Sequence, residues 1–375
     1  MSTRIILVGG SSGGHSFPLV PIALELQKQA LAKGVRLELI LAGTGSDFLK
    51  NAAVELQLPY LRIFAGKLRR YFSVHNALDF LKMPFSVVQS LYYLWLYMPD
   101  LIFSKGGYDS IPPLIAARLL FIPVVVHESD SVPGLANKIA SRFAVKIFTS
   151  FDGATRYFPA DRTELVGNPI RQELTGGSKE EALALFRLKG DRPTILFFGG
   201  SQGARVINEA VLLSLVQLTQ KYHVVHQCGT INFAQIKAQA ESMIVEGEGS
   251  YGKNLEENYR LYPFFKQKDM NLAYAAADII VSRAGAGSIF EIAALGKPAI
   301  MVPLKGSASD HQLANATEFA KYGAVIVEED NLTTNILMAE IENVLIRKDQ
   351  MSEQIRSFAR PDAARIIAEG LLKLI

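Results

Sequence analysis

Short runs of β-branched and other apolar residues alternate along the chain with longer segments in which apolar positions recur at helical spacing. This alternation is typical of parallel βαβ units, in which a helix follows each strand and crosses back over the sheet. In the amino-terminal half, the pattern predicts strands at 4–8, 35–41, 101–103, 124–126 and 146–149. In the carboxy-terminal half, it predicts strands at 194–198, 223–226, 278–281, 299–302 and 325–327.

The two series of strands indicate two domains, which agrees with a length of 375 residues at roughly 150 residues per domain. Glycine and proline accumulate between the series, at 164–187, as expected of an interdomain connection. We expect a first domain at 1–164 and a second at 165–358. The last segment, 359–375, has apolar residues at helical spacing and is expected to form a helix that packs back on the first domain.

The composition is that of a globular protein, with 49% hydrophobic and 20% charged residues. A net charge of +3 is too small to indicate a nucleic-acid-binding protein. The single cysteine, Cys228, favours a reducing compartment, and its simplest interpretation is a small buried side chain at a strand end. No signal peptide is expected before the first strand, and the most apolar later window, 83–103, is interrupted by prolines and polar residues.

Each series opens with a strand that runs into glycines and then into a helix: ILVGGSSGGHSFP at 6–18 and ILFFGGSQGARVIN at 195–208. Glycines let the backbone approach an anion, and the first turn of a helix offers free amides, so both loops are candidate phosphate sites. A turn that needs glycine for its geometry alone is the alternative for either loop. Neither loop matches GxxxxGK[ST] or GxGxxG, which disfavours P-loop hydrolysis of ATP or GTP and, less strongly, dinucleotide binding.

Three further loops follow predicted strands. SKGGYDSIPP at 104–113 offers another set of loop amides. SRAGAGSIFEIAALGKPAI at 282–300 places Glu291 three residues after Ser288, which fits either a helix-capping box or a carboxylate that accepts both hydroxyls of a ribose. PLKGSASDHQLANA at 303–316 contains polar groups that suit a sugar, with helix capping as the alternative for Asp310.

Two side chains are suited to proton transfer: His15 at the end of the first glycine loop, and Glu128 after the strand at 124–126. Ligands bind at the carboxyl ends of strands in α/β sheets, so both side chains are expected to face one crevice. A solvated or structural histidine is the alternative for His15.

Several segments occur together in the order found in one family: GGH at 13–15, SKGGYDS, VVVHESDSVPGLANK, VGNPIR, GGSQGAR, HQCG, AYAAADIIVSRAG and DHQLANA. On these segments, nearly the whole chain resembles the MurG family of bacterial UDP-N-acetylglucosamine transferases. The resemblance implies an α/β fold of GT-B type, with two Rossmann-like domains facing across a cleft. It also implies inverting transfer of GlcNAc from UDP-GlcNAc to undecaprenyl-pyrophosphoryl-MurNAc-pentapeptide, the lipid I to lipid II step of peptidoglycan synthesis. The alternatives are a UDP-sugar-dependent diacylglycerol glycosyltransferase and a binding protein with a degenerate site.

Under this resemblance, His15 is the first candidate for the general base and Glu128 the second, and we expect neither a metal nor another cofactor. The residues that the resemblance assigns to UDP-GlcNAc are Ser12, Gly13, Gly14, Asp130, Arg171, Ser201, Phe265, Ala286, Gly287, Ser288, Glu291 and Gln312. The residues that it assigns to the acceptor are Ser11, Gly106, Gly107, Tyr108 and Asn137.

Three departures from the family's pattern bear on these assignments. The loop GGSSGGH is one residue longer than the usual GGTGGH, so the place of the threonine falls to Ser12 or to neither serine. Asp130 stands in HESD where HEQN is common, and it lacks the amide donor of asparagine. The segment PFFKQKDM is longer than usual before its Asp-Met pair, which leaves open which backbone group near Phe265 meets uracil.

The lipid acceptor implies a peripheral protein at the cytoplasmic side of the cell membrane, with the first domain in contact with the bilayer. The segment 67–98 offers basic residues for anionic headgroups and apolar bulk for the interface, with packing in the core as the alternative for the apolar residues. The residues concerned are Lys67, Arg69, Arg70, Tyr71, Phe72, Phe80, Phe85, Tyr92, Tyr93, Leu94, Trp95 and Tyr97.

Overall fold

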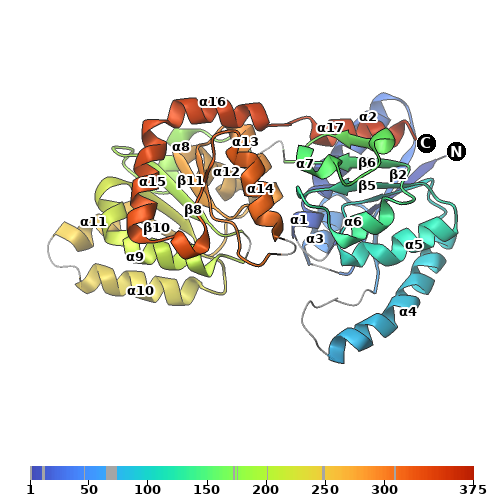
Figure 1. Cartoon of the computed structure of the whole chain (residues 1–375), viewed down its shortest axis with the longest axis horizontal. Helices are drawn as coiled ribbons and strands as arrows, with labels where there is room; N and C mark the ends of the chain where they lie inside the picture. Colours follow the sequence, from blue (N-terminus) through green and yellow to red (C-terminus); the bar gives the residue numbers. More distant parts are fainter. Residues whose placement is uncertain are drawn as a thin grey trace. The chain divides into compact units, whose positions relative to one another are not determined.

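The chain forms two compact units, one made of Met1–Arg171 with Arg360–Ile375 and the other of Gln172–Ala359. In the computed structural model, each unit has its own sheet with helices packed around it (Figure 1). The model describes residues 2–10, 13–45, 47–64, 74–171, 174, 176–200, 202–246, 250–307 and 310–375, with the backbone alone at 74–81, 250 and 267. The predicted functional residues that lie outside this description are Ser11, Ser12, Ser201, residues 67–72 and the side chain of Phe80.

The first unit contains a parallel seven-stranded sheet in the order β3-β2-β1-β4-β5-β6-β7. Its strands are β1 (Thr3–Val8), β2 (Leu37–Gly43), β3 (Tyr60–Arg62), β4 (Leu101–Ser104), β5 (Val124–Glu128), β6 (Lys146–Thr149) and β7 (Thr163–Leu165). Its helices are α1 (Gly13–Ser16), α2 (Leu19–Ala32), α3 (Asp47–Glu55), α4 (Val74–Tyr97), η1 (Tyr108–Ser110), α5 (Ile111–Leu119), α6 (Leu135–Ala140), α7 (Asp152–Thr155), η2 (Ala160–Arg162) and α17 (Ala363–Leu372).

Successive residues of β1 pack into two different hydrophobic cores, one on each face of the sheet, because side chains alternate between the faces of a strand. Ile5 and Leu7 pack into the core that includes residues of α2, α3 and α17, and α17 lies along α2. Ile6 and Val8 pack into the core that includes residues of α4, α5 and α6. The strand order reverses between β1 and β4, so the loops after these two strands flank the position where sheets of this type bind ligands.

The second unit contains a parallel six-stranded sheet in the order β10-β9-β8-β11-β12-β13, which reverses between β8 and β11 in the same way. Its strands are β8 (Thr194–Phe198), β9 (His223–Gln227), β10 (Tyr259–Tyr262), β11 (Ile279–Ser282), β12 (Ala299–Met301) and β13 (Val325–Ile326). Its helices are α8 (Lys179–Leu185), α9 (Arg205–Lys221), α10 (Phe233–Glu246), α11 (Ser250–Asn258), α12 (Gln267–Ala276), α13 (Ala286–Leu295), α14 (His311–Ala320), η5 (Glu329–Asn331), α15 (Thr334–Ile346) and α16 (Lys348–Phe358).

All of the strands predicted from the sequence are present, which confirms two parallel α/β units. The sequence pattern missed β3, β7 and β10, and each of these strands lies at the edge of its sheet. An edge strand pairs on one side only, and the missed strands carry polar residues such as Arg62, Glu164 and Arg260 where a central strand has apolar ones.

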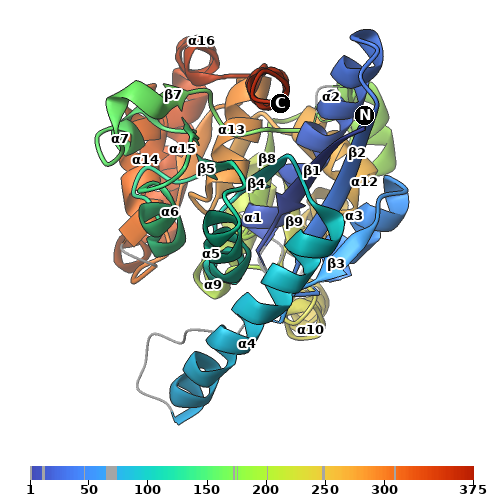
Figure 2. The same cartoon turned by 90° about the vertical axis from the view of Figure 1, so that its right-hand side faces the viewer.

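Helix α4 packs beside α5 (Figure 2). Leu94 is 3% exposed and belongs to the core, so its predicted place at a membrane surface is wrong. Tyr93 and Tyr97 are partly buried against the same core. A stripe of apolar side chains remains exposed along the described part of the helix: Phe85, Val88, Tyr92, Trp95 and Leu96.

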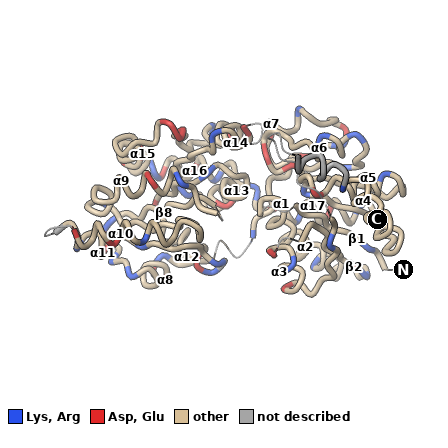
Figure 3. The backbone as a smooth tube through the Cα atoms, turned by 90° about the horizontal axis from the view of Figure 1, so that it is seen from below, with Lys and Arg blue, Asp and Glu red and all other residues tan. Residues whose placement is uncertain are grey.

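No helix within the described ranges is both long and apolar enough to cross a bilayer. Basic and acidic residues are interspersed along the backbone of each unit (Figure 3). This mixture agrees with the small net charge of +3.

Candidate active site

His15 lies in α1, directly after the loop that follows β1. Its ring Nδ1 is 3.0 Å from the main-chain oxygen of Lys105, at the end of β4. A carbonyl oxygen only accepts, so Nδ1 carries the hydrogen and Nε2 keeps the lone pair that a base needs. Ser16 donates to the main-chain oxygen of Gly10 at 2.6 Å and holds this turn against the strand end. The two loops at the reversal point of the first sheet therefore orient one imidazole.

Gly106 and Gly107 allow the loop after β4 to approach its neighbours. Their φ angles of +79° and +88° lie in the left-handed region that favours glycine. A Cβ on Gly106 would lie 2.8 Å from Asn137 Nδ2, and a Cβ on Gly107 would lie 3.3 Å from His15 Cδ2. Tyr108 follows at the start of η1. The structure thus brings the predicted residues His15, Gly106, Gly107 and Asn137 together at the carboxyl edge of the first sheet.

Glu128 ends β5 and is 2% exposed. Its carboxylate accepts from the backbone N–H of Asp130 at 2.9 Å, from that of Gly134 at 3.1 Å and from Asn137 Nδ2 at 2.8 Å. These three bonds fix the turn between β5 and α6. Glu128 therefore braces this loop.

A buried cluster around Lys105 did not emerge from the sequence. Lys105 Nζ lies 2.5 Å from His127 Nδ1 and donates to Asn168 Oδ1 at 3.0 Å. His127 Nε2 is 2.9 Å from the main-chain oxygen of Gly167, so this nitrogen carries the hydrogen and Nδ1 accepts from Lys105. Lys105 thereby links the ends of β4 and β5 to the segment after β7. The sequence did contain one signal for this cluster, namely a charged residue directly after an apolar strand. The glycines beside it directed the interpretation toward loop amides instead.

Burial governs the ionisation of this cluster. It lowers the pKa of Lys105 to about 7 and the pKa of His127 well below its ordinary value. It raises the pKa of Glu128 to about 7, with the charge of Asp130 adding to the effect. Burial also lowers the pKa of His15 below 6.5, against the opposing charge of Asp130, so His15 is neutral at pH 7.

In the second unit, the glycine loop after β8 is tightly packed. Gly200 and Gly203 have φ angles of +82° and +78°. A Cβ on Gly203 would lie 2.0 Å from the main-chain oxygen of Cys228, and a Cβ on Gly199 would lie 2.2 Å from the backbone nitrogen of Ala204. Glycine is therefore required here by geometry. Cys228 itself is buried at the end of β9, as predicted.

The loop after β11 leads into α13, whose N-cap is Gly285 and has no side-chain cap. The first amides of the helix, at Ala286, Gly287 and Ser288, have no acceptor within the helix. The capping-box interpretation of Ser288 and Glu291 is wrong, because the helix begins before Ser288. Glu291 is half-buried, and its Oε2 accepts from the hydroxyl of Tyr274 at 2.8 Å.

Gln312, another residue predicted to bind UDP-GlcNAc, lies in the first turn of α14. Gln312 Oε1 accepts from the backbone N–H of Leu304 at 3.0 Å. Asp310 occupies the N-cap of α14, but its side chain does not cap the helix. The guanidinium of Arg171 lies 4.7 Å from the ring centre of Phe17, within the first unit.

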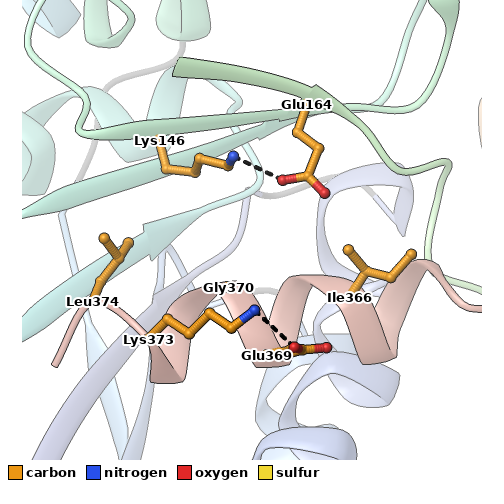
Figure 4. Close-up of a pocket in the computed structure, with 7 residues that line it drawn as sticks. All are labelled: Lys146, Glu164, Ile366, Glu369, Gly370, Lys373 and Leu374. Carbon is orange, nitrogen blue, oxygen red and sulfur yellow. Dashed lines mark ion pairs between the residues drawn. The ribbon is translucent and has the colours of Figure 1, made fainter. Parts of the chain in front are cut away.

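A hollow of about 330 Å³ in the first unit lies apart from these residues (Figure 4). Ion pairs of 2.7 Å between Lys146 and Glu164 and of 2.8 Å between Glu369 and Lys373 border it. None of the predicted site residues lines this hollow. Across the described residues, no group of three or more His, Cys, Asp or Glu side chains could hold a metal ion.

Two family models match the chain. Residues 5–149 match the glycosyltransferase family 28 N-terminal domain, and residues 194–369 match the glycosyltransferase family 28 C-terminal domain. A UDP-N-acetylglucosamine–N-acetylmuramyl-(pentapeptide) pyrophosphoryl-undecaprenol N-acetylglucosamine transferase of Legionella pneumophila (strain Paris) is 36% identical over 95% of this chain and 93% of its own length. A protein of the same name from Treponema pallidum subsp. pallidum is 36% identical over 99% of this chain and 95% of its own length. The chain belongs to the MurG family of glycosyltransferases.

The crystal structure of Acinetobacter baumannii MurG agrees with this assignment, with a TM-score of 0.72 and 26% identity over 99% of both chains. The UDP-GlcNAc 2-epimerase of Neisseria meningitidis, bound to UDP-GlcNAc, has a TM-score of 0.70 at 14% identity over 99% of this chain and 100% of its own, which is evidence of fold alone. The MurG family assignment confirms the predicted GT-B class.

Proposed function

We propose that the chain transfers GlcNAc from UDP-GlcNAc to the MurNAc hydroxyl of undecaprenyl-pyrophosphoryl-MurNAc-pentapeptide, at the cytoplasmic face of the membrane. The observation that carries this proposal is 36% identity over nearly the whole chain to transferases named for this donor and acceptor. The shared fold alone would not decide it, since unrelated chemistries use the same fold.

In this reaction, the acceptor hydroxyl attacks the anomeric carbon of GlcNAc as UDP departs. His15 Nε2 takes the hydroxyl proton, because Nδ1 is bonded to the main-chain oxygen of Lys105 and the ring is neutral at pH 7. Asn137 and Glu128 hold the loop beside it. The family pattern assigns the acceptor contacts to Gly106, Gly107, Tyr108 and Ser11.

The second unit binds the donor. Amides at the loop after β8, with Ser201, and at Ala286 to Ser288 stabilise the negative charge that develops on the leaving diphosphate. Glu291 accepts the ribose hydroxyls, with its carboxylate oriented by the Tyr274 hydroxyl. Donor contacts also come from the other residues that the family pattern assigns: Ser12, Gly13, Gly14, Asp130, Arg171, Phe265 and Gln312.

The exposed stripe on α4 is the proposed contact with the bilayer. Val88, Tyr92 and Trp95 are 64%, 57% and 67% exposed and recur at helical spacing, so they lie on one side of the helix. An apolar helix face with aromatic residues is suited to the membrane interface.

A transfer assay tests this function. Purified full-length protein is incubated with labelled UDP-GlcNAc and a short-chain lipid I analogue, with UDP-Glc and diacylglycerol as competitors. We expect labelled disaccharide lipid and equimolar UDP, with little effect of either competitor. Transfer to diacylglycerol would overturn the assignment of the acceptor, and bound UDP-GlcNAc without turnover would indicate a binding protein.

A further inference from the structure

Gln227 is the last residue of β9, and it lies between the ends of the two neighbouring strands. In the sheet register it is opposite Phe198, which ends β8, and Tyr262, which ends β10. Its side chain is 3% exposed. It therefore lies at the point where the glycine loop after β8 and the segment leading to Phe265 both leave the sheet.

The Gln227 amide connects these two segments. Its Nε2 donates to the main-chain oxygen of Gly200 at 3.0 Å, and its Oε1 accepts from the backbone N–H of Phe265 at 2.9 Å. A primary amide is the uncharged group that offers a donor and an acceptor side by side. A buried carboxylate or thioether here would leave at least one of the two backbone groups without its bond.

The strand end that carries Gln227 is itself held firmly. Asn208 Nδ2 and Asn232 Nδ2 both donate to the main-chain oxygen of Cys228 at 2.9 Å. His226 Nε2 lies 3.0 Å from Asn208 Oδ1. The residues on both sides of Gln227 are fixed by these bonds. The Gln227 amide therefore sets the positions of the two loops, and not the reverse.

We propose that Gln227 is a positioning residue for the donor nucleotide, which holds the diphosphate-binding loop and the base-binding segment at a set separation. The proposal rests on the proposed function, in which these two segments bind the two ends of UDP. Both of these hydrogen bonds of the Gln227 side chain are to backbone groups, so in this proposal the residue acts through the loops and not on the substrate.

The hydrogen bond between Gln227 and Phe265 also affects which nucleobase the site recognises. The N–H of Phe265 is directed to Gln227, which leaves the carbonyl as the Phe265 backbone group for pairing with a base. A carbonyl accepts from the N3–H of uracil, whereas N3 of cytosine has no hydrogen to donate. In Gln227→Met the side chain has no oxygen to accept this hydrogen, so the Phe265 N–H is released and can donate to cytosine N3, and discrimination between UDP and CDP falls. In Gln227→Glu a carboxylate oxygen still accepts the Phe265 N–H, and only the bond to Gly200 is lost.

The test uses the full chain with Gln227→Glu, which conserves size, and Gln227→Met, which avoids a buried charge. Asn258→Asp is the matched control, because Asn258 is an equally buried amide of the same unit that bonds within its own helix. Affinities for UDP and CDP are measured by calorimetry, and KM is measured separately for UDP-GlcNAc and for the lipid acceptor.

In both Gln227 variants, we expect at least tenfold weaker UDP binding, a tenfold rise in the donor KM and an unchanged acceptor KM. The ratio of UDP to CDP affinity should fall in Gln227→Met and stay close to that of the unaltered protein in Gln227→Glu, which loses only the bond to Gly200. An unchanged ratio in Gln227→Met, or equal losses in Asn258→Asp, would overturn the proposal, because Gln227 would then be a structural residue. Failure of the unaltered protein to bind UDP would instead overturn the proposed function.

Discussion

The ring of His15 hydrogen-bonds through Nδ1 to the main-chain oxygen of Lys105, whose own side chain reaches His127. Lys105 therefore orients the candidate base through its main-chain oxygen and links two strand ends through its side-chain nitrogen. The first contact sets the tautomer of His15, and the second fixes the strand end from which that contact is made.

Replacing His15 should abolish most of the activity without unfolding the protein. For His15→Ala, we expect kcat to fall by about 10² to 10⁴, the usual contribution of a positioned base. Glu128→Gln should cost kcat less, because the amide keeps the size of the side chain and one oxygen, which can still accept from Gly134 and Asn137. Steady-state kinetics at saturating substrates check this, with melting temperatures as the control. The opposite order of the two losses would assign the base to Glu128.

The pH dependence of kcat/KM distinguishes His15 from Glu128 as the general base. Burial lowers the pKa of His15, so the form able to accept a proton is present above a midpoint that lies below pH 6.5. Burial raises the pKa of Glu128 to about 7, so a base at that position would give a midpoint near 7. We expect the acid limb of kcat/KM, measured from pH 5 to 8, to have its midpoint below 6.5.

The lowered pKa of Lys105 should make the free energy of unfolding increase with pH. Its pKa is about 7 when folded and ordinarily 10.5, so between these values the unfolded chain binds a proton that the folded chain lacks. Each pH unit in this window then adds about 1.4 kcal/mol to the free energy of unfolding. In urea denaturation from pH 7.5 to 9.5, we expect this slope to disappear in Lys105→Met and to persist in Lys237→Met, a control at an exposed lysine. Equal slopes in the two variants would contradict a depressed pKa.

The two sides of α4 should respond differently to substitution. Val88→Ser combined with Trp95→Ser removes exposed apolar surface, so we expect loss of flotation with phosphatidylglycerol vesicles at unchanged stability. Leu94→Ala opens a cavity in the core and should lower the free energy of unfolding by about 2–5 kcal/mol while flotation persists. Flotation that survives the double substitution would argue against α4 as the membrane contact.

Glu291 should control recognition of the ribose. Loss of a hydrogen bond to a charged group corresponds to about 1.5–3 kcal/mol, or roughly 10- to 150-fold in affinity. We expect Glu291→Ala to weaken UDP binding by this factor and to remove the preference for UDP over 2′-deoxy-UDP. Tyr274→Phe, which leaves the carboxylate but removes its hydroxyl partner, should have a smaller effect in the same calorimetric titration. A preference for UDP that survives in Glu291→Ala would place the ribose elsewhere.

Local patterns in the chain were sufficient to predict both sheets, because central parallel strands are buried on both faces and appear as apolar runs such as 101–103 and 194–198. The edge strands β3, β7 and β10 were not predicted, since polar residues such as Arg62, Glu164 and Arg260 interrupt their apolar runs. The same limitation affected α4, where periodicity could not separate buried Leu94 from exposed Trp95.

The glycine loops, His15 and Glu128 were likewise predictable, because residues at strand ends converge on one edge of a sheet. The residues that hydrogen-bond to these loops could not be predicted from the sequence. The contacts of Lys105 with His127 and Asn168, and of Gln227 with Gly200 and Phe265, join residues that are distant in sequence and adjacent only in the folded sheet. Charge state and tautomer depend on such contacts and on burial, so only the tertiary structure shows that the carbonyl of Lys105 faces Nδ1 of His15 and that the Glu128 carboxylate holds its own loop.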